Sequence, residues 1–145
     1  MELSFIAFLQ KSPWHMMLFG TALATGSMLI WPVFSRIFSG ATPQVGAVEA
    51  VQLINRRDAL VLDVRASGEF ASGHIPNARN IPAGELGGRL REIEKFKSRP
   101  VVVHCQAGTR AATVCDLLRK NGFGEVFALR GGLSGWTEAS LPVEK

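Results

Sequence analysis

Apolar residues are spread unevenly along the chain, and the longest uncharged stretch lies near the amino terminus. Between Lys11 and Arg36 stand 24 residues without a single Asp, Glu, Lys or Arg. A helix of that length reaches about 36 Å, which exceeds the roughly 30 Å of a bilayer's hydrocarbon core. Apolar residues occur all round this segment, so it has no polar face to turn to water. The pattern predicts an amino-terminal flank over 1–11 and a transmembrane helix over 12–35.

A cleaved signal peptide is the main alternative for this segment. The run Ala22-Leu23-Ala24 has the small-x-small form of a cleavage site. Cleavage there would leave the mostly apolar run 28–34 near a new, exposed terminus. This consequence favours an uncleaved anchor.

Charge and small residues suggest how the span is oriented and whether it pairs. One lysine precedes the span, and three arginines follow it: Arg36, Arg56 and Arg57. Because positive residues are enriched in cytoplasmic flanks, we expect the carboxyl-terminal part of the chain to face the cytoplasm. Gly20 and Ala24 have the small-x-x-x-small spacing that lets two helices approach closely, so a homodimer is a further expectation.

The pattern changes beyond a polar linker expected over 36–44, and a folded domain is expected over 45–145. Short apolar runs of strand-like composition alternate there with segments whose apolar residues recur at helical spacing. Strands are predicted near 59–64, 100–104 and 125–129, and helices near 47–54, 90–96 and 111–118. This alternation predicts an α/β fold, a doubly wound and mostly parallel sheet with helices on both faces.

Composition narrows the range of functions. The formal net charge of +4 is spread along the chain and forms no basic run, so we expect no nucleic-acid partner. Cys105 and Cys115 are too few for a disulfide scaffold and do not form a C-x-x-C pair. No zinc site, and no other metal site, follows from them.

One predicted strand–helix junction carries a cysteine. The segment from Cys105 to Arg110 leaves the strand at 100–104 and enters the helix at 111–118, with Gly108 near the middle of the turn. Successive backbone N–H groups, together with the positive end of the following helix, would surround the sulfur and stabilise a thiolate. Arg110 adds a fixed cation. The residues alone predict a nucleophile that meets an anionic substrate, and a buried structural cysteine is the alternative.

The same loop and two further motifs resemble the rhodanese (sulfurtransferase) family of single-domain type, over roughly residues 45–142. The run Leu62-Asp63-Val64-Arg65 and the run 73–78 (GHIPNA) are similar to the first family signature. Residues 105–110 (CQAGTR) are similar to the active loop, and 131–136 (GGLSGW) to the closing signature. A rhodanese domain behind one amino-terminal helix also looks like a known bacterial arrangement, which implies the bacterial inner membrane as its location.

The resemblance implies a membrane-anchored sulfurtransferase that needs no metal or organic cofactor. Cys105 would take the outer sulfur of a small donor such as thiosulfate as a persulfide and pass it to a thiol or to cyanide. The substrate-binding residues implied by the loop are Gln106, Ala107, Gly108, Thr109 and Arg110. Asp63 and Arg65 lie at the end of a predicted strand and are expected to brace the loop. The expected partners are these small molecules, the lipid bilayer, and a second copy or another membrane protein.

Two other functions stay open beside sulfur transfer. Protein tyrosine phosphatases separate their cysteine and arginine by five residues, whereas four stand between Cys105 and Arg110, which disfavours phosphatase or arsenate-reductase chemistry. A non-catalytic adaptor that recruits partners to the membrane would have no need of an activated thiolate. The two-domain thiosulfate enzymes of the family have a basic residue where Gln106 stands, so thiosulfate is weakly supported as the physiological donor.

Three remaining features are given structural roles. His104 is expected to point away from Cys105, because neighbours on a strand face opposite sides of the sheet. Cys115 lies on an apolar helix stripe and is expected to pack in the core. The glycines between 131 and 135 predict a tight turn.

Overall fold

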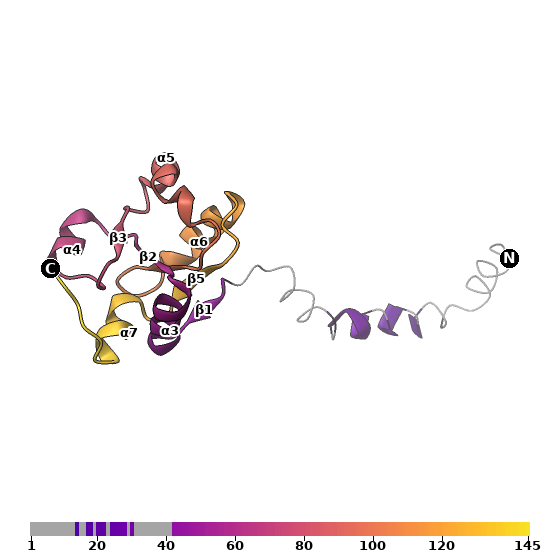
Figure 1. Cartoon of the computed structure of the whole chain (residues 1–145). Helices are drawn as coiled ribbons and strands as arrows, with labels where there is room; N and C mark the ends of the chain where they lie inside the picture. Colours follow the sequence, from indigo (N-terminus) through magenta and orange to yellow (C-terminus); the bar gives the residue numbers. More distant parts are fainter. Residues whose placement is uncertain (1–13, 15–16, 19, 23, 29, 31–41) are drawn as a thin grey trace. The chain divides into compact units, whose positions relative to one another are not determined.

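A computed structural model of the chain describes residues 14, 17–18, 20–22, 24–28, 30 and 42–145 (Figure 1). The chain divides into two compact units, Met1–Ala41 and Thr42–Lys145. In the first unit the described residues are helical. No helix within the described ranges is long and apolar enough to cross a membrane. The predicted flank over 1–11 and much of the predicted span and linker lie outside these ranges, so the anchor stays a prediction.

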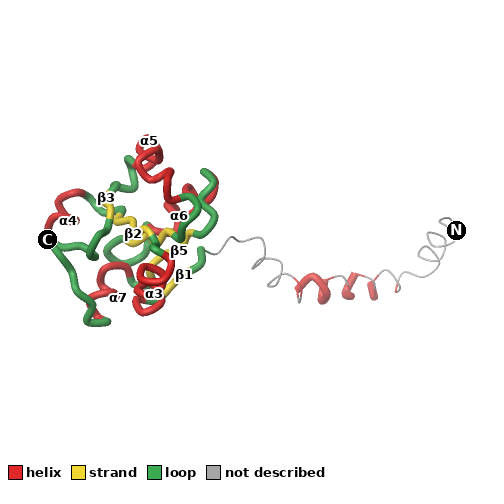
Figure 2. The backbone as a smooth tube through the Cα atoms, viewed as in Figure 1, coloured by secondary structure: helices red, strands yellow, loops and turns green. Residues whose placement is uncertain are grey.

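The unit Thr42–Lys145 is built on a five-stranded parallel sheet with the strand order β1-β5-β4-β2-β3. Figure 2 draws the strands in yellow among the helices in red. The strands are β1 (Gln44–Val45), β2 (Leu60–Asp63), β3 (Arg79–Asn80), β4 (Val101–His104) and β5 (Val126–Leu129). The helices are α3 (Ala47–Arg57), α4 (Ser67–Ser72), α5 (Leu86–Arg89), the 3₁₀ helix η1 (Leu90–Phe96), α6 (Ala111–Lys120) and α7 (Gly132–Glu138).

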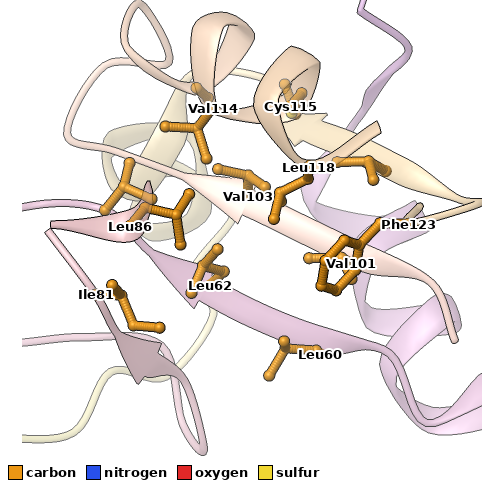
Figure 3. Packing of buried hydrophobic residues seen from close by; sticks show 14 of the residues in the cluster. Leu60, Leu62, Ile81, Leu86, Val101, Val103, Val114, Cys115, Leu118 and Phe123 are labelled. Atoms are coloured by element: carbon orange, nitrogen blue, oxygen red, sulfur yellow. The ribbon is translucent and has the colours of Figure 1, made fainter. Parts of the chain in front are cut away.

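The two faces of the sheet are covered by different helices. Leu62 and Val103 lie in a buried cluster with residues of α5, η1 and α6 (Figure 3). Val61 and Val102, one position before them on the same strands, lie in a second cluster with residues of α3 and α7. Side chains alternate across a strand, so a strand buried on both faces is apolar throughout, as β2 and β4 nearly are. The predicted α/β fold, with a parallel sheet and helices on both faces, is confirmed.

The structure adds detail to two predicted segments. The helix predicted near 90–96 is confirmed as Leu90–Phe96 and is of the 3₁₀ type. Its apolar residues Leu90, Ile93 and Phe96 recur every three residues, which suits the three-residue turn of a 3₁₀ helix. The tight turn predicted from the glycines between 131 and 135 is present at Arg130–Gly131, where Gly131 lies in the left-handed region at a φ of 73°. Gly132 and Gly135 belong to the first turn of α7.

Two strands were not predicted because each is only two residues long. A run that short shows no measurable alternation of apolar and polar residues. β1 begins at Gln44, inside the predicted linker, and pairs with β5 at the edge of the sheet. β3 pairs with β2 at the opposite edge.

Candidate active site

Cys105 lies at the carboxyl end of the central strand of the sheet. β4 ends at His104, between β5 and β2, and α6 begins at Ala111. The loop 105–110 therefore occupies the strand-to-helix position where parallel sheets commonly bind ligands. The predicted strand-to-helix junction at 105–110 is confirmed.

The loop turns back so that one of its own amides meets the cysteine sulfur. The Gly108 N–H donates to Sγ of Cys105 at 2.9 Å. Gly108 has a φ of 90°, in the left-handed region that glycine adopts without steric cost. Cys105 itself is 2% exposed, although most of the loop residues around it reach solvent. An N–H group directed at sulfur stabilises its anionic form.

The orientation of the first two loop peptides is set by α7. The N–H of Leu133 donates to the carbonyl of Cys105 at 2.9 Å, and the N–H of Ser134 donates to the carbonyl of Gln106 at 3.3 Å. The peptide bonds are trans, so the N–H groups of Gln106 and Ala107 point away from α7. Within the described part of the chain these two N–H groups have no protein acceptor. They are free to bind a ligand.

Gly132 makes this close approach of α7 possible. A Cβ atom at this position would lie 2.2 Å from the carbonyl oxygen of Cys105 and 2.8 Å from that of Gln106. The residue also has a φ of 57°, in the left-handed region. Only glycine fits, so the closing motif and the active loop depend on each other sterically.

Asp63 and Arg65 lie beside the loop and are buried as an ion pair. A nitrogen of the Arg65 guanidinium donates to a carboxylate oxygen of Asp63 at 2.7 Å, and both side chains are at most 3% exposed. The same guanidinium donates to the carbonyl of Gly73 at 2.7 Å and to Oε1 of Gln106 at 3.3 Å. Arg65 therefore connects β2, the segment after α4, and the cysteine loop. The structure places the two residues where the sequence predicted, and their functional role stays a prediction.

His104 belongs to the same buried group, which the sequence did not predict. Its ring is fully buried, with Nε2 3.5 Å from a carboxylate oxygen of Asp63, too far for a hydrogen bond. Burial lowers the pKa of His104 and outweighs the opposite effect of the Asp63 charge. A neutral imidazole is therefore expected at this position near pH 7. The parallel register of β2 and β4, which pairs Asp63 with His104, brings them together.

Two of the predicted substrate-binding side chains have different surroundings. Arg110 is exposed at the start of α6 and has no hydrogen-bond or ion-pair partner within the described part of the chain. Gln106 is engaged by the protein, because its Nε2 donates to Oγ of Ser134 at 3.3 Å while its Oε1 accepts from Arg65. Sequence reasoning missed Ser134, although it lies within the closing motif.

The profile of the rhodanese-like domain family matches residues 46–139, more than half of the chain. The chain belongs to the rhodanese family. It is 37% identical over 92 residues to a protein of Allochromatium vinosum named sulfurtransferase, covering 63% of this chain and 84% of that protein. It is 34% identical over 119 residues to the uncharacterized protein YibN of Escherichia coli, covering 79% of this chain and 83% of that protein.

The fold is shared with solved rhodanese structures. The crystal structure of a rhodanese-related protein from Thermoplasma volcanium matches with a TM-score of 0.63 at 29% sequence identity. The match covers 70% of this chain and 97% of that one. Within the described ranges, no group of three or more His, Cys, Asp or Glu side chains could hold a metal ion. At the candidate site, Cys105 Sγ accepts the N–H of Gly108, and the N–H groups of Gln106 and Ala107 have no acceptor among the described residues.

Proposed function

We propose that this rhodanese is a membrane-anchored sulfurtransferase that carries sulfane sulfur on Cys105. The observation that supports the proposal best is the Gly108 N–H directed at Sγ of Cys105, 2.9 Å away, in a loop between β4 and α6. The N–H groups of Gln106 and Ala107 are also available to a ligand. They point away from α7, because α7 binds the carbonyls of the same two peptides. These N–H groups suit a reaction in which negative charge moves on and off sulfur.

The first half-reaction loads the cysteine. The Cys105 thiolate attacks the outer sulfur of a donor such as thiosulfate, and the new S–S bond forms as the bond inside the donor breaks. Sulfite leaves with the bonding electron pair. The loop amides and the unpaired guanidinium of Arg110 stabilise the anionic donor and the leaving group. No outside oxidant or reductant is required.

The second half-reaction returns the cysteine to its resting form. A nucleophile such as cyanide or a thiolate attacks the outer sulfur of the persulfide, and the Cys105 thiolate leaves with the electron pair of the broken S–S bond. Because Cys105 is 2% exposed, the nucleophile has to reach past the loop residues. A slender acceptor meets this condition better than a thiol on a rigid protein surface. The two half-reactions predict ping-pong kinetics.

Loading of the cysteine is tested by mass spectrometry of the full-length protein after incubation with thiosulfate. One added sulfur on the peptide that contains Cys105, removed again by cyanide, is the expected result. A cysteine that stays unmodified with every sulfane donor would favour the non-catalytic adaptor. Hydrolysis of a phosphate ester faster than sulfur transfer would favour the phosphatase instead.

The membrane anchor is a separate part of the proposal. It is supported by the 24 residues before Arg36 that carry no Asp, Glu, Lys or Arg, a length that can span a bilayer as a helix. The full-length protein should stay with bacterial inner membranes after alkaline washing. Release into the supernatant would overturn the anchor, and a periplasmic signal from a reporter fused after Lys145 would overturn the cytoplasmic orientation.

A further inference from the structure

We propose that Ser134 is a positioning residue of the Cys105 site: it holds the Gln106 peptide so that the N–H of Ala107 points away from α7 and stays available to a bound ligand. The inference rests on the proposed sulfur transfer and extends it to a residue outside the loop. Ser134 lies in the first turn of α7 and is partly buried.

Three hydrogen bonds join Ser134 to the residue after the cysteine. The N–H of Ser134 donates to the carbonyl of Gln106 at 3.3 Å, and its Oγ donates to the same carbonyl at 3.2 Å. Oγ also accepts a hydrogen bond from Nε2 of Gln106 at 3.3 Å. Both the main chain and the side chain of Gln106 are therefore held by one serine.

The far end of the Gln106 side chain is held as well. Its Oε1 accepts from Arg65 at 3.3 Å, and Arg65 is anchored in turn by the buried Asp63 carboxylate. Gln106 therefore links α7 to the buried Asp63–Arg65 ion pair at the carboxyl end of β2. A glutamine fixed at both ends cannot turn its peptide freely, so the N–H of Ala107 keeps its direction away from α7.

This arrangement assigns a different use to the residue after the cysteine. Both polar ends of the Gln106 side chain bond to the protein, at Arg65 and at Ser134, so the side chain is held in place and fixes the backbone beside it. Gln106 offers its backbone N–H to a ligand. The hydroxyl of Ser134 then acts on the reaction through the orientation of the amides, and its removal should slow the step in which anionic charge develops.

Substitution of Ser134 in the full-length protein tests this role. Ser134→Ala should lower the rate constant for persulfide formation at saturating thiosulfate by about fivefold, with a smaller change in KM, because both hydrogen bonds of Oγ to Gln106 are lost while the Ser134 N–H still holds the carbonyl. Ser134→Thr restores the hydroxyl and should recover most of the rate. Thr137→Val is the matched control, because its hydroxyl bonds only to carbonyls within α7. It should leave the rate within about twofold of wild type.

A second measurement separates this inference from sulfur transfer itself. The Cys105 thiolate attacks the methylene carbon of either iodoacetate or iodoacetamide and displaces iodide. Only iodoacetate is an anion, so the ratio of the two rates reports how well the site binds negative charge. Ser134→Ala should lower this ratio at Cys105 about fivefold, and Ser134→Thr should restore it. Alkylation can be measured even if no sulfur donor loads the wild-type protein. That failure would contradict the proposed sulfur transfer and would leave the role of Ser134 to be decided by the alkylation ratio.

The opposite results are equally clear. A ratio and a loading rate unchanged in Ser134→Ala, in a protein whose thermal unfolding matches wild type, would overturn the positioning role. Equal losses in Ser134→Ala and Thr137→Val would show a general effect on α7. If Gln106 is the residue through which Ser134 acts, the double variant with Gln106→Met should lose no more than the larger of the two single losses.

Discussion

The two cysteines of the chain have different surroundings, although they lie close in sequence. Cys105 and Cys115 are ten residues apart, and both are free and buried in the same core cluster. Cys105 receives the Gly108 N–H at its sulfur. Cys115 lies on the apolar face of α6, where burial raises its pKa to about 12. Both side chains are buried, so their surroundings differ in the N–H donor that the loop turns toward the Cys105 sulfur.

Backbone geometry decides which of the two sulfurs has a free N–H donor within reach, since the side chains are of the same type. In the middle of α6 every backbone N–H is used by the helix, and none is available to a side chain there. In the loop before α6 the amides have no such partners, and α7 takes up the carbonyls of Cys105 and Gln106. A cysteine becomes a nucleophile candidate where the chain leaves regular structure.

The largest expected contrast is in activity after each cysteine is replaced. Cys105→Ser should lower sulfur transfer from thiosulfate to cyanide by about 1,000-fold or more, because the nucleophile is lost. Cys115→Ala should keep activity within about threefold, because its protonated, packed thiol takes no part. Steady-state assays of the two full-length variants check this. A Cys115→Ala variant that folds normally but loses activity would show that Cys115 takes part in the reaction.

A second large effect is expected where α7 touches the cysteine loop. Gly132→Ala forces a Cβ against the Cys105 carbonyl, 2.2 Å away, and should reduce the free energy of unfolding by about 2–4 kcal/mol. Urea denaturation gives the value. Gly124→Ala is the control, since nothing lies within 4 Å of its added Cβ, and it should change stability by less than about 1 kcal/mol. Equal effects in both variants would contradict the steric dependence of loop on helix.

The packed thiol should make stability depend on pH at the alkaline end. Its pKa is raised from 9.0 to about 12, so the unfolded chain loses the proton at lower pH than the folded one. The contribution of Cys115 is fully present below pH 9 and is lost as the pH rises toward 12, by at most about 1.4 kcal/mol per pH unit. Urea denaturation from pH 8 to 11 should show a steeper decline in wild type than in Cys115→Ala. Identical slopes would mean that the thiol is not shielded.

The smallest expected effect concerns the cation of the loop. Arg110→Ala should lower kcat/KM for thiosulfate about two- to fivefold, because an exposed charge contributes little, and added salt should reduce the difference. Lys120→Ala, at the other end of α6, removes a charge of the same sign and should change little. If kcat/KM falls equally in the two variants, the donor responds to the net charge of the protein, and Arg110 makes no specific contact with it.

Much of the site could be predicted because its residues are contiguous. The apolar run of β4, the glycine at 108 and the helical stripe of α6 are local patterns, and they placed Cys105 in a strand-to-helix loop. Asp63 was placed at the same edge because parallel strands end together. The four-residue strands β2, β4 and β5 were predicted because each is a local run of mostly apolar residues. The two-residue strands β1 and β3 were missed, since their pairing partners and not their own residues make them strands.

Local order along the chain was therefore enough to predict the alternation of strands and helices, the parallel sheet, and a cysteine at its edge. Tertiary structure alone decided which carbonyls α7 holds, that Gln106 is fixed between Arg65 and Ser134, and that His104 lies buried beside Asp63. These contacts join residues many positions apart. Spacing and periodicity describe neighbours along the chain, whereas the contacts appear only when the sheet brings its strand ends and α7 to the same edge.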